Sequence, residues 1–228
     1  MPNQPLLGIK ACVFDAYGTL FDFASAARAC PDMPGEAAGA LTALWRDKQV
    51  QYTWLRAVQG RHADFAQVTA DALDFALETL ALDRLGLRDR LLDLYLGLAA
   101  FPDVPEALAR VRAAGLRTAI LSNGTPAMLD SAVAAARLAG CFDAVLSVEE
   151  VGAFKPDRRV YQLAIDRLGI PAGAIAFVSS NGWDAHAASA FGMQVVWCNR
   201  TAQRRERLPG VPDREIAMLA ELPALVGA

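Results

Sequence analysis

The sequence predicts an α/β protein in which a doubly wound, mostly parallel sheet carries an inserted all-helical segment. Four short apolar runs rich in Val, Ile and Phe recur along the chain and are typical of buried parallel strands. Segments with helical spacing lie between these runs, which is the alternation of a doubly wound sheet. After the first run, a long stretch with helical spacing and no convincing strand indicates a helical insertion.

The first strand is predicted at ACVF, directly before Asp15. Amphipathic helical spacing then appears at Ala40 to Val58 and at Phe65 to Leu82, and the α/β alternation resumes only after Ala99. We therefore expect a helical cap over the carboxyl ends of the strands. The predicted domains are a cap at residues 23–98 and a core at residues 1–22 and 99–228.

The core continues with strands and helices in alternation. Further strands are predicted at TAIL, AIAFV and QVVW, with a weaker one, AVLS, that ends at Ser147. Helices are predicted at Pro105 to Ala114, Pro126 to Leu138 and Arg158 to Leu168. The Arg- and Pro-rich stretch from Thr201 to Arg214 is expected to be a surface loop, followed by a last helix that begins near Glu215.

Polar side chains follow several of the predicted strands at the point where each strand ends. Asp15 follows the first strand, and Ser122 and Asn123 follow TAIL. Ser179 opens the polar stretch after AIAFV, with Asp184 close behind. In an open α/β sheet, ligands bind outside the carboxyl ends of the strands, near the point where the strand order switches. The sequence therefore predicts a site built from these strand ends.

Four motifs occur in order along the chain, namely DAYGTLFD from Asp15, LSNG from Leu121, FKP from Phe154 and SSNGWD from Ser179. Together with LWRDKQVQYTWL in the predicted cap, they resemble the haloacid dehalogenase superfamily, and specifically its L-2-haloacid dehalogenases. The resemblance spans nearly the whole chain. It implies a Rossmann-like core with a cap, hydrolysis of a small 2-halo carboxylate without a metal or other cofactor, and a homodimer whose interface involves the cap.

Two positions favour halide displacement over the phosphoryl transfer of other superfamily members. Those phosphatases generally carry a second Asp two residues after the nucleophile as a general acid, and Tyr17 stands there. Ser180 stands where they carry an acidic magnesium ligand, and the loss of one carboxylate weakens a magnesium site. Chloride and bromide, by contrast, leave as stable anions and need no proton. A magnesium-dependent phosphatase and a non-catalytic binder of small carboxylates remain the alternatives.

The resemblance implies a two-step reaction that begins when the Asp15 carboxylate attacks the halogen-bearing carbon. Halide leaves in the same step, and the substrate is then held as an ester of Asp15. Water attacks the carbonyl of this ester and releases a 2-hydroxy acid whose stereocentre was inverted once, so an L substrate gives a D product.

Further site residues follow from the resemblance and from the charges involved. The substrate carboxylate and the halide are anions, so cations and hydrogen-bond donors are expected around them. By resemblance, Arg46 and Asn123 receive the halide, and Ser122 and Lys155 hold the carboxylate. The residues matched to the positioning of hydrolytic water are Asp184, Ser179, Asn181 and Lys155. Those matched to other polar positions are Thr19 and Tyr161, and those matched to the apolar wall are Tyr17, Phe65 and Trp183.

Several of these residues also fit a purely structural role. Arg46 fits a solvated helix face, Phe65 and Trp183 fit a core, and Tyr161 fits the packing of a helix. His186 comes two residues after the last motif. It either narrows the pocket or is a surface side chain that points away from the site, and the second interpretation is favoured.

The composition is that of a globular protein that acts on a small molecule. The 228 residues are 54% hydrophobic, and their net charge of -3 offers no basic field, so nucleic acid is not expected as a partner. No apolar run reaches the roughly 18 to 20 residues of a membrane span, and the first residues lack the pattern of a signal peptide. We therefore expect a cytoplasmic protein. The four cysteines are widely spaced and are expected to stay reduced.

Overall fold

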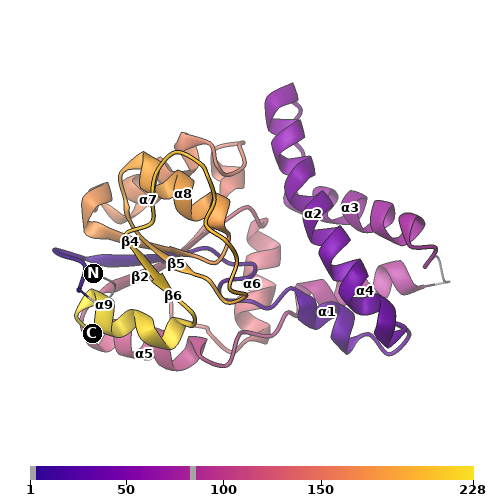
Figure 1. Ribbon diagram of the computed structural model, residues 1–228, viewed down its shortest axis with the longest axis horizontal. Helices are drawn as coiled ribbons and strands as arrows, with labels where there is room; N and C mark the ends of the chain where they lie inside the picture. Colours follow the sequence, from indigo (N-terminus) through magenta and orange to yellow (C-terminus); the bar gives the residue numbers. More distant parts are fainter. Residues whose placement is uncertain (1–3, 83–85) are drawn as a thin grey trace.

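A doubly wound parallel sheet, as predicted, forms the core of the computed structural model, which describes residues 4–82 and 86–228 (Figure 1). Its strand order is β3-β2-β1-β4-β5-β6, so that β2 and β3 lie on one side of β1 and the later strands lie on the other. The strands are β1 at Ala11–Phe14, β2 at Arg117–Ser122, β3 at Ala144–Ser147, β4 at Ile175–Ser179, β5 at Gln194–Cys198 and β6 at Arg214–Ile216.

The two central strands are buried on both faces. Every residue of β1 and of β4 is buried, which explains why each is an unbroken apolar run rather than an alternating one. Phe14 of β1 is in register with Ile120 of β2 and Val178 of β4. The polar residues that follow these strands therefore emerge at one edge of the sheet.

Helices cover both faces of the sheet, with α7 and α8 on one face and α5 and α9 on the other (Figure 1). Local signals in the sequence place their ends. The hydroxyl of Thr125 caps α6 by accepting a hydrogen bond from the Met128 N–H, and α7 ends at Gly169, whose φ of 64° suits glycine. The helices are α5 at Val104–Ala113, α6 at Pro126–Ala135, α7 at Arg158–Leu168, α8 at Gly182–Phe191 and α9 at Leu222–Val226, with 3₁₀ turns η1 at Val148–Glu150, η2 at Ala172–Ala174 and η3 at Leu219–Glu221.

The described residues between 23 and 98 form helices and no strand. These helices are α1 at Ala24–Ala29, α2 at Gly35–Gln59, α3 at Phe65–Thr79 and α4 at Leu87–Leu96. Asp64 sets the start of α3, because its carboxylate accepts a hydrogen bond from the Gln67 N–H. The long helix α2 projects beyond the other helices of this segment, and its carboxyl-terminal end lies on the side of the molecule that carries α7 and α8 (Figure 1).

The prediction for the carboxyl-terminal region was wrong in two respects. Arg214 lies in β6, a short edge strand that pairs with β5, and not in a loop. The last helix begins at Leu222 and not near Glu215. Pro223 explains this start, because proline is tolerated in the first turn of a helix but would break one that had begun seven residues earlier. A strand of three residues is too short for its periodicity to be seen in the sequence.

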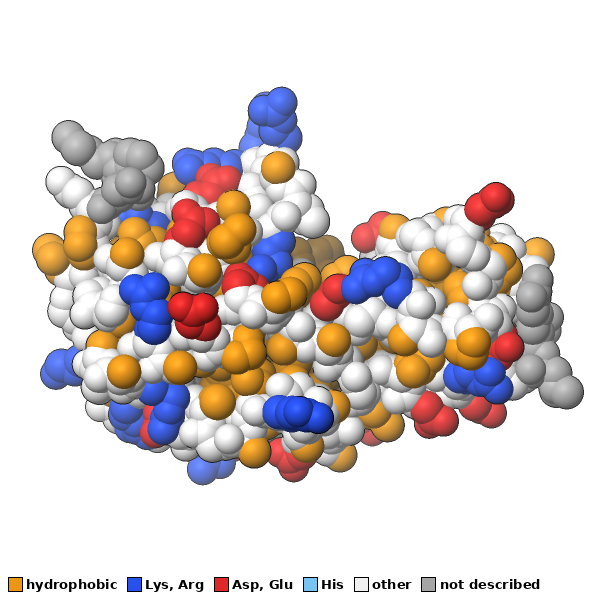
Figure 2. Space-filling model, turned by 90° about the horizontal axis from the view of Figure 1, so that it is seen from below, with side chains coloured by type: hydrophobic (Ala, Val, Ile, Leu, Met, Phe, Trp, Pro, Cys, Tyr) orange, Lys and Arg blue, Asp and Glu red, His pale blue; other side chains and the backbone are white. Residues whose placement is uncertain are grey.

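The surface carries charges of both signs. On the face drawn in Figure 2, Lys and Arg side chains alternate with Asp and Glu among apolar groups, and no broad basic area is seen there. None of the helices in residues 4–82 and 86–228 combines the length and the apolar character that a membrane span requires.

Candidate active site

The edge of the sheet formed by the ends of β1 and β4 holds a cluster of buried polar side chains. The Asp15 carboxylate is its centre and is 6% exposed. Its Oδ2 accepts hydrogen bonds from Asn181 Nδ2 at 2.8 Å and from the Thr19 hydroxyl at 3.1 Å, and the Ser179 hydroxyl lies 3.5 Å away. Its Oδ1 accepts one from Lys155 Nζ at 3.0 Å. These donors fix the carboxylate in one orientation.

Thr19 ties the loop after β1 to the loop after β4. Its Oγ1 accepts a hydrogen bond from the Ser180 N–H at 2.8 Å, which leaves the hydroxyl proton for Asp15. The Ser179 Oγ similarly accepts the Asn181 N–H at 3.1 Å, so the loop that presents Asn181 is held by its own side chains.

Lys155 lies between two carboxylates in the interior. Its ammonium is 3.0 Å from Asp15 Oδ1 and 2.8 Å from Asp184 Oδ2, and the side chains of Lys155 and Asp184 are 1% and 0% exposed. Burial disfavours the ammonium, but attraction to the two carboxylates outweighs it and raises the pKa of Lys155 above 10.5. Burial also raises the pKa of Asp184 above 3.8, against the opposing attraction of Lys155. Lys155 is therefore a permanent cation at neutral pH.

Tyr161 combines the two roles that the sequence left open. Its ring packs edge-on against Phe177, with ring centroids 5.8 Å apart, and its hydroxyl donates a 2.7 Å hydrogen bond to Asp184 Oδ1. Burial and the neighbouring Asp184 carboxylate raise the pKa of Tyr161 well above 10, so the phenol stays protonated. Both oxygens of Asp184 thus have a donor.

Arg46 enters this cluster from α2. Its guanidinium donates to Asn181 Oδ1 at 3.3 Å and to Gln49 Oε1 at 2.7 Å. Gln49 is 1% exposed and in turn donates to the Thr69 hydroxyl at 2.7 Å and the Tyr95 hydroxyl at 3.1 Å. A chain of hydrogen bonds within the helical segment therefore holds the Arg46 guanidinium beside Asn181.

A small cavity lies against these groups, and we call it the reaction cavity. Its volume is only about 10 Å³, which is room for roughly one water molecule. Asn123 Oδ1 accepts the Lys155 N–H at 3.0 Å at one side of it, and the rings of Tyr17 and Phe65 pack with centroids 5.7 Å apart at another. The residues that line it are Asp15, Tyr17, Arg46, Val50, Phe65, Ser122, Asn123, Lys155 and Trp183.

A family model for haloacid dehalogenase-like hydrolases matches residues 9–192.

The chain is a haloacid dehalogenase-like hydrolase.

The hydrolase is similar over almost its whole length to two curated proteins. It is 46% identical to (S)-2-haloacid dehalogenase 1 of Pseudomonas sp. (strain CBS-3) over 219 residues, which span 96% of each chain. It is 47% identical to the (S)-2-haloacid dehalogenase of Pseudomonas sp. (strain YL) over 214 residues, which span 92% of this chain and 91% of the relative. The solved L-2-haloacid dehalogenase from Xanthobacter autotrophicus with chloropropionic acid covalently bound has a TM-score of 0.88 and 39% identity, covering 95% of this chain and 98% of that one.

The structure brings the predicted site residues of the hydrolase into two connected groups. The polar group around Asp15 contains Thr19, Lys155, Tyr161, Ser179, Asn181 and Asp184. The remaining predicted residues line the reaction cavity, and Asp15 and Lys155 belong to both groups. Among the described residues of the hydrolase, no three His, Cys, Asp or Glu side chains converge as a set of metal ligands.

Sequence reasoning missed Gln49 and Val50, although both belong to the predicted cap motif. Val50 lines the reaction cavity, and Gln49 orients Arg46. The signal was present, because Trp45, Gln49 and Thr53 are the buried stripe of α2 at helical spacing. A polar residue in such a stripe needs buried partners, and that requirement points to the hydrogen bonds that hold Arg46.

The predicted surface position of His186 was wrong. The side chain is 4% exposed rather than at the surface, with Nδ1 3.3 Å from the Leu208 carbonyl. It does not line the reaction cavity. The loop that contains Leu208 covers it, and this loop approaches α8 closely at Gly210, where a Cβ atom would lie 2.2 Å from the His186 carbonyl oxygen.

Proposed function

We propose that this hydrolase is an (S)-2-haloacid dehalogenase that converts a small L-2-haloalkanoate into the D-2-hydroxy acid. The observation that carries the proposal is the Asp15 carboxylate, which Lys155 and Asn181 orient at the wall of a cavity that Arg46 also lines. The names of the similar proteins support the same chemistry, and the relative with chloropropionic acid covalently bound supports a covalent intermediate.

Tyr17 supports a leaving group that departs without a proton. It lies at the position where a general acid is expected in the phosphatases, but burial raises the pKa of its phenol well above 10. A phenol with such a pKa is a poor proton donor at neutral pH. Halide needs no donor, whereas an alkoxide leaving group does.

In the first step, an oxygen of Asp15 forms a bond to C2 of the substrate while the carbon–halogen bond breaks and the halide leaves with the electron pair. Arg46 and Asn123 receive the halide, and Ser122 and Lys155 hold the substrate carboxylate. The attack comes from the face opposite the halogen, so the configuration at C2 is inverted. Tyr17, Phe65 and Trp183 surround the apolar part of the substrate.

In the second step, water attacks the carbonyl carbon of the Asp15 ester. Asp184 takes the proton from this water, while Ser179, Asn181 and Lys155 help to position it. The bond between that carbonyl carbon and the ester oxygen breaks, and the proton held by Asp184 passes to this oxygen as it leaves. The D-2-hydroxy acid therefore leaves with the original Asp15 oxygen, and Asp15 keeps the oxygen from water. Thr19 and Tyr161 hold Asp15 and Asp184 in place through their hydrogen bonds.

The proposal includes a cap that opens. A reaction cavity of about 10 Å³ has no room for a 2-haloalkanoate, so part of its wall must move to admit one. We assign this role to residues 23–98 as the cap domain, over a core of residues 1–22 and 99–228. We further propose a homodimer and a cytoplasmic location. Four free cysteines support a reducing compartment.

The test of the proposed function measures chloride released from L- and D-2-chloropropionate, with and without EDTA, together with hydrolysis of an aryl phosphate. We expect chloride from the L isomer alone, at the same rate with EDTA, because no step uses a metal. Phosphate release that EDTA abolishes would instead identify a magnesium-dependent phosphatase. A protein that is folded but inactive on every substrate would be a binder of small carboxylates.

The Tyr161→Phe variant is expected to lose activity first at the acidic end of the pH range. The Tyr161 hydroxyl stabilises the ionised form of Asp184, so its removal raises the pKa of Asp184 further. Asp184 accepts a proton only when ionised, so the acidic limb of kcat against pH moves to higher pH. At neutral pH we expect a loss of about tenfold.

Tyr52→Phe on α2, whose side chain lies outside the site, is the matched control. A lower kcat at every pH with the acidic limb in its original place would mean that Tyr161 only packs against its neighbours.

A further inference from the structure

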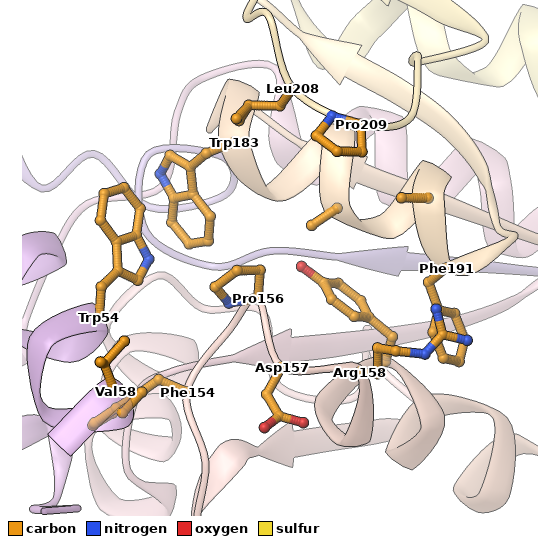
Figure 3. A pocket seen from close by; sticks show the side chains of 14 residues that line it. Trp54, Val58, Phe154, Pro156, Asp157, Arg158, Trp183, Phe191, Leu208 and Pro209 are labelled. Atoms are coloured by element: carbon orange, nitrogen blue, oxygen red, sulfur yellow. The ribbon is translucent and has the colours of Figure 1, made fainter. Parts of the chain in front are cut away.

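A large groove, lined in part by Trp183, lies outside the reaction cavity (Figure 3). Its volume is about 690 Å³, and it is bounded by the carboxyl-terminal end of α2, the loop before α7, and α8. Most of its wall is apolar, including Trp54, Val58, Phe154, Pro156, Phe191 and Leu208. The reaction described above uses none of these six residues.

Trp183 alone among the described lining residues belongs to both the groove and the reaction cavity. Lys155 lines the reaction cavity, while its chain neighbours Phe154 and Pro156 line the groove. The partition between the two spaces is therefore about one side chain thick. Trp54 of α2 supports this partition, because its ring packs edge-on against the Trp183 ring with ring centroids 5.4 Å apart.

Asp157 and Tyr161 in the groove wall are already paired with protein groups. The Asp157 carboxylate accepts hydrogen bonds from Arg159, and the Tyr161 hydroxyl donates to Asp184. The Arg158 guanidinium lies 5.0 Å from the centre of the Phe191 ring. Arg158 is exposed and has no ion pair with another described residue, and it lies at the Phe191 end of the groove. The rest of the wall is mainly apolar and therefore suits an apolar occupant.

We propose that the groove is a subsite for the alkyl chain of long-chain 2-haloalkanoates, reached when the Trp183 ring moves aside. The proposal rests on the proposed function. The carboxylate and the halide of such a substrate stay beside Lys155 and Arg46, which leaves the alkyl chain on C2 as the apolar substituent. Trp183 is the part of the apolar wall of the reaction cavity that borders the groove.

A second cavity of about 530 Å³ also borders the reaction cavity, at Arg46, Val50 and Trp183, and it is less suitable for an alkyl chain. Asp47, Glu206, Gln203 and Asn181 contribute to its wall. These polar groups suit water, and an alkyl chain placed there would desolvate them. The apolar groove is therefore the expected place for the chain.

The test compares kcat/KM for L-2-chloropropionate and L-2-bromooctanoate in the full-length protein. We expect the parent to use both acids. Ala187 lies in the groove wall four residues after Trp183 on α8, so Ala187→Trp fills the groove. Each methylene moved from water into an apolar site gains up to about fourfold in binding, so we expect a loss of about tenfold or more on bromooctanoate. Activity on chloropropionate should change by less than about twofold.

A second variant covers the case in which Ala187→Trp does not fold. Val58 is 88% exposed, so Val58→Asp places a carboxylate in the groove wall with little risk to folding, and the same selective loss is expected. Leu55→Asp, on the same helix but outside the groove, and Ala43→Trp, in the polar cavity, are the matched controls. Neither should change the ratio of the two activities.

Three results would overturn the subsite. The first is a parent protein that uses chloropropionate but not bromooctanoate. The second is groove variants in which the ratio of kcat/KM for bromooctanoate to kcat/KM for chloropropionate is unchanged, and the third is that Ala43→Trp alone changes this ratio. If light scattering finds that the groove variants lose the dimer while their ratio is unchanged, the groove is an interface between copies of the chain. A parent that releases no halide from either acid refutes the proposed function itself.

Discussion

The Asp15→Asn variant is expected to release chloride from L-2-chloropropionate at least about ten-thousand-fold more slowly than the parent. The neutral amide is nearly the same size as the carboxylate and can still contact Asn181 and Thr19. It lacks the negative charge that attacks C2, and no other carboxylate lines the reaction cavity among the described residues. The fold should be retained, because the substitution removes a charge that lies beside Lys155 without leaving a void.

The measurement combines steady-state chloride release with a single turnover in water labelled with ¹⁸O. In the parent, mass spectrometry of the peptide that contains Asp15 should find one labelled oxygen, because water attacks the carbonyl carbon of the ester. Asp89→Asn changes an 81% exposed side chain in the same chemical way and should leave both readouts unchanged. Parental rates in Asp15→Asn, or label that appears only in the product, would refute nucleophilic attack by Asp15.

The core strands could be predicted because each is a buried apolar run that ends in a polar residue. ACVF and AVLS match β1 and β3 residue for residue, and Asp15 follows β1 as expected. The edge strand β6 could not be predicted, because only one of its three residues, Ile216, is buried. An edge strand is defined mainly by its pairing with a neighbour, and this pairing has no signature in so short a segment.

The identity of the site residues was more predictable than the way in which they are held. Motif order placed Asp15, Lys155 and Asp184 at one edge of the sheet, and the structure adds that the ammonium bridges both carboxylates. That bridge depends on the path of the loop before α7, which local sequence does not specify. Gln49 was missed for a similar reason, since its partners Thr69 and Tyr95 lie on α3 and α4 and are far away in sequence.

The Lys155→Met variant is expected to lose both activity and stability. Removal of the ammonium leaves the Asp184 carboxylate buried without its cation and beside the negative charge of Asp15. Removal of one member of a buried ion pair costs about 3–5 kcal/mol of the free energy of unfolding. Activity should fall by at least about a thousandfold, because the substrate carboxylate and both reaction steps lose the same cation. Lys10→Met, at an exposed position, is the matched control.

The pH dependence of unfolding separates loss of charge from loss of packing. In Lys155→Met, the folded-state pKa of Asp184 rises further above its ordinary 3.8, so the folded protein binds a proton that the unfolded chain lacks. Stability relative to the parent therefore recovers as the pH falls through the raised pKa towards 3.8 and is lowest at neutral pH.

The double variant Lys155→Met, Asp184→Asn removes the unpaired charge and should recover much of the lost stability in urea titrations at neutral pH, while it stays inactive. A stability deficit that is the same at every pH, and that Asp184→Asn does not relieve, would mean that Lys155 contributes only the packing of its alkyl stem.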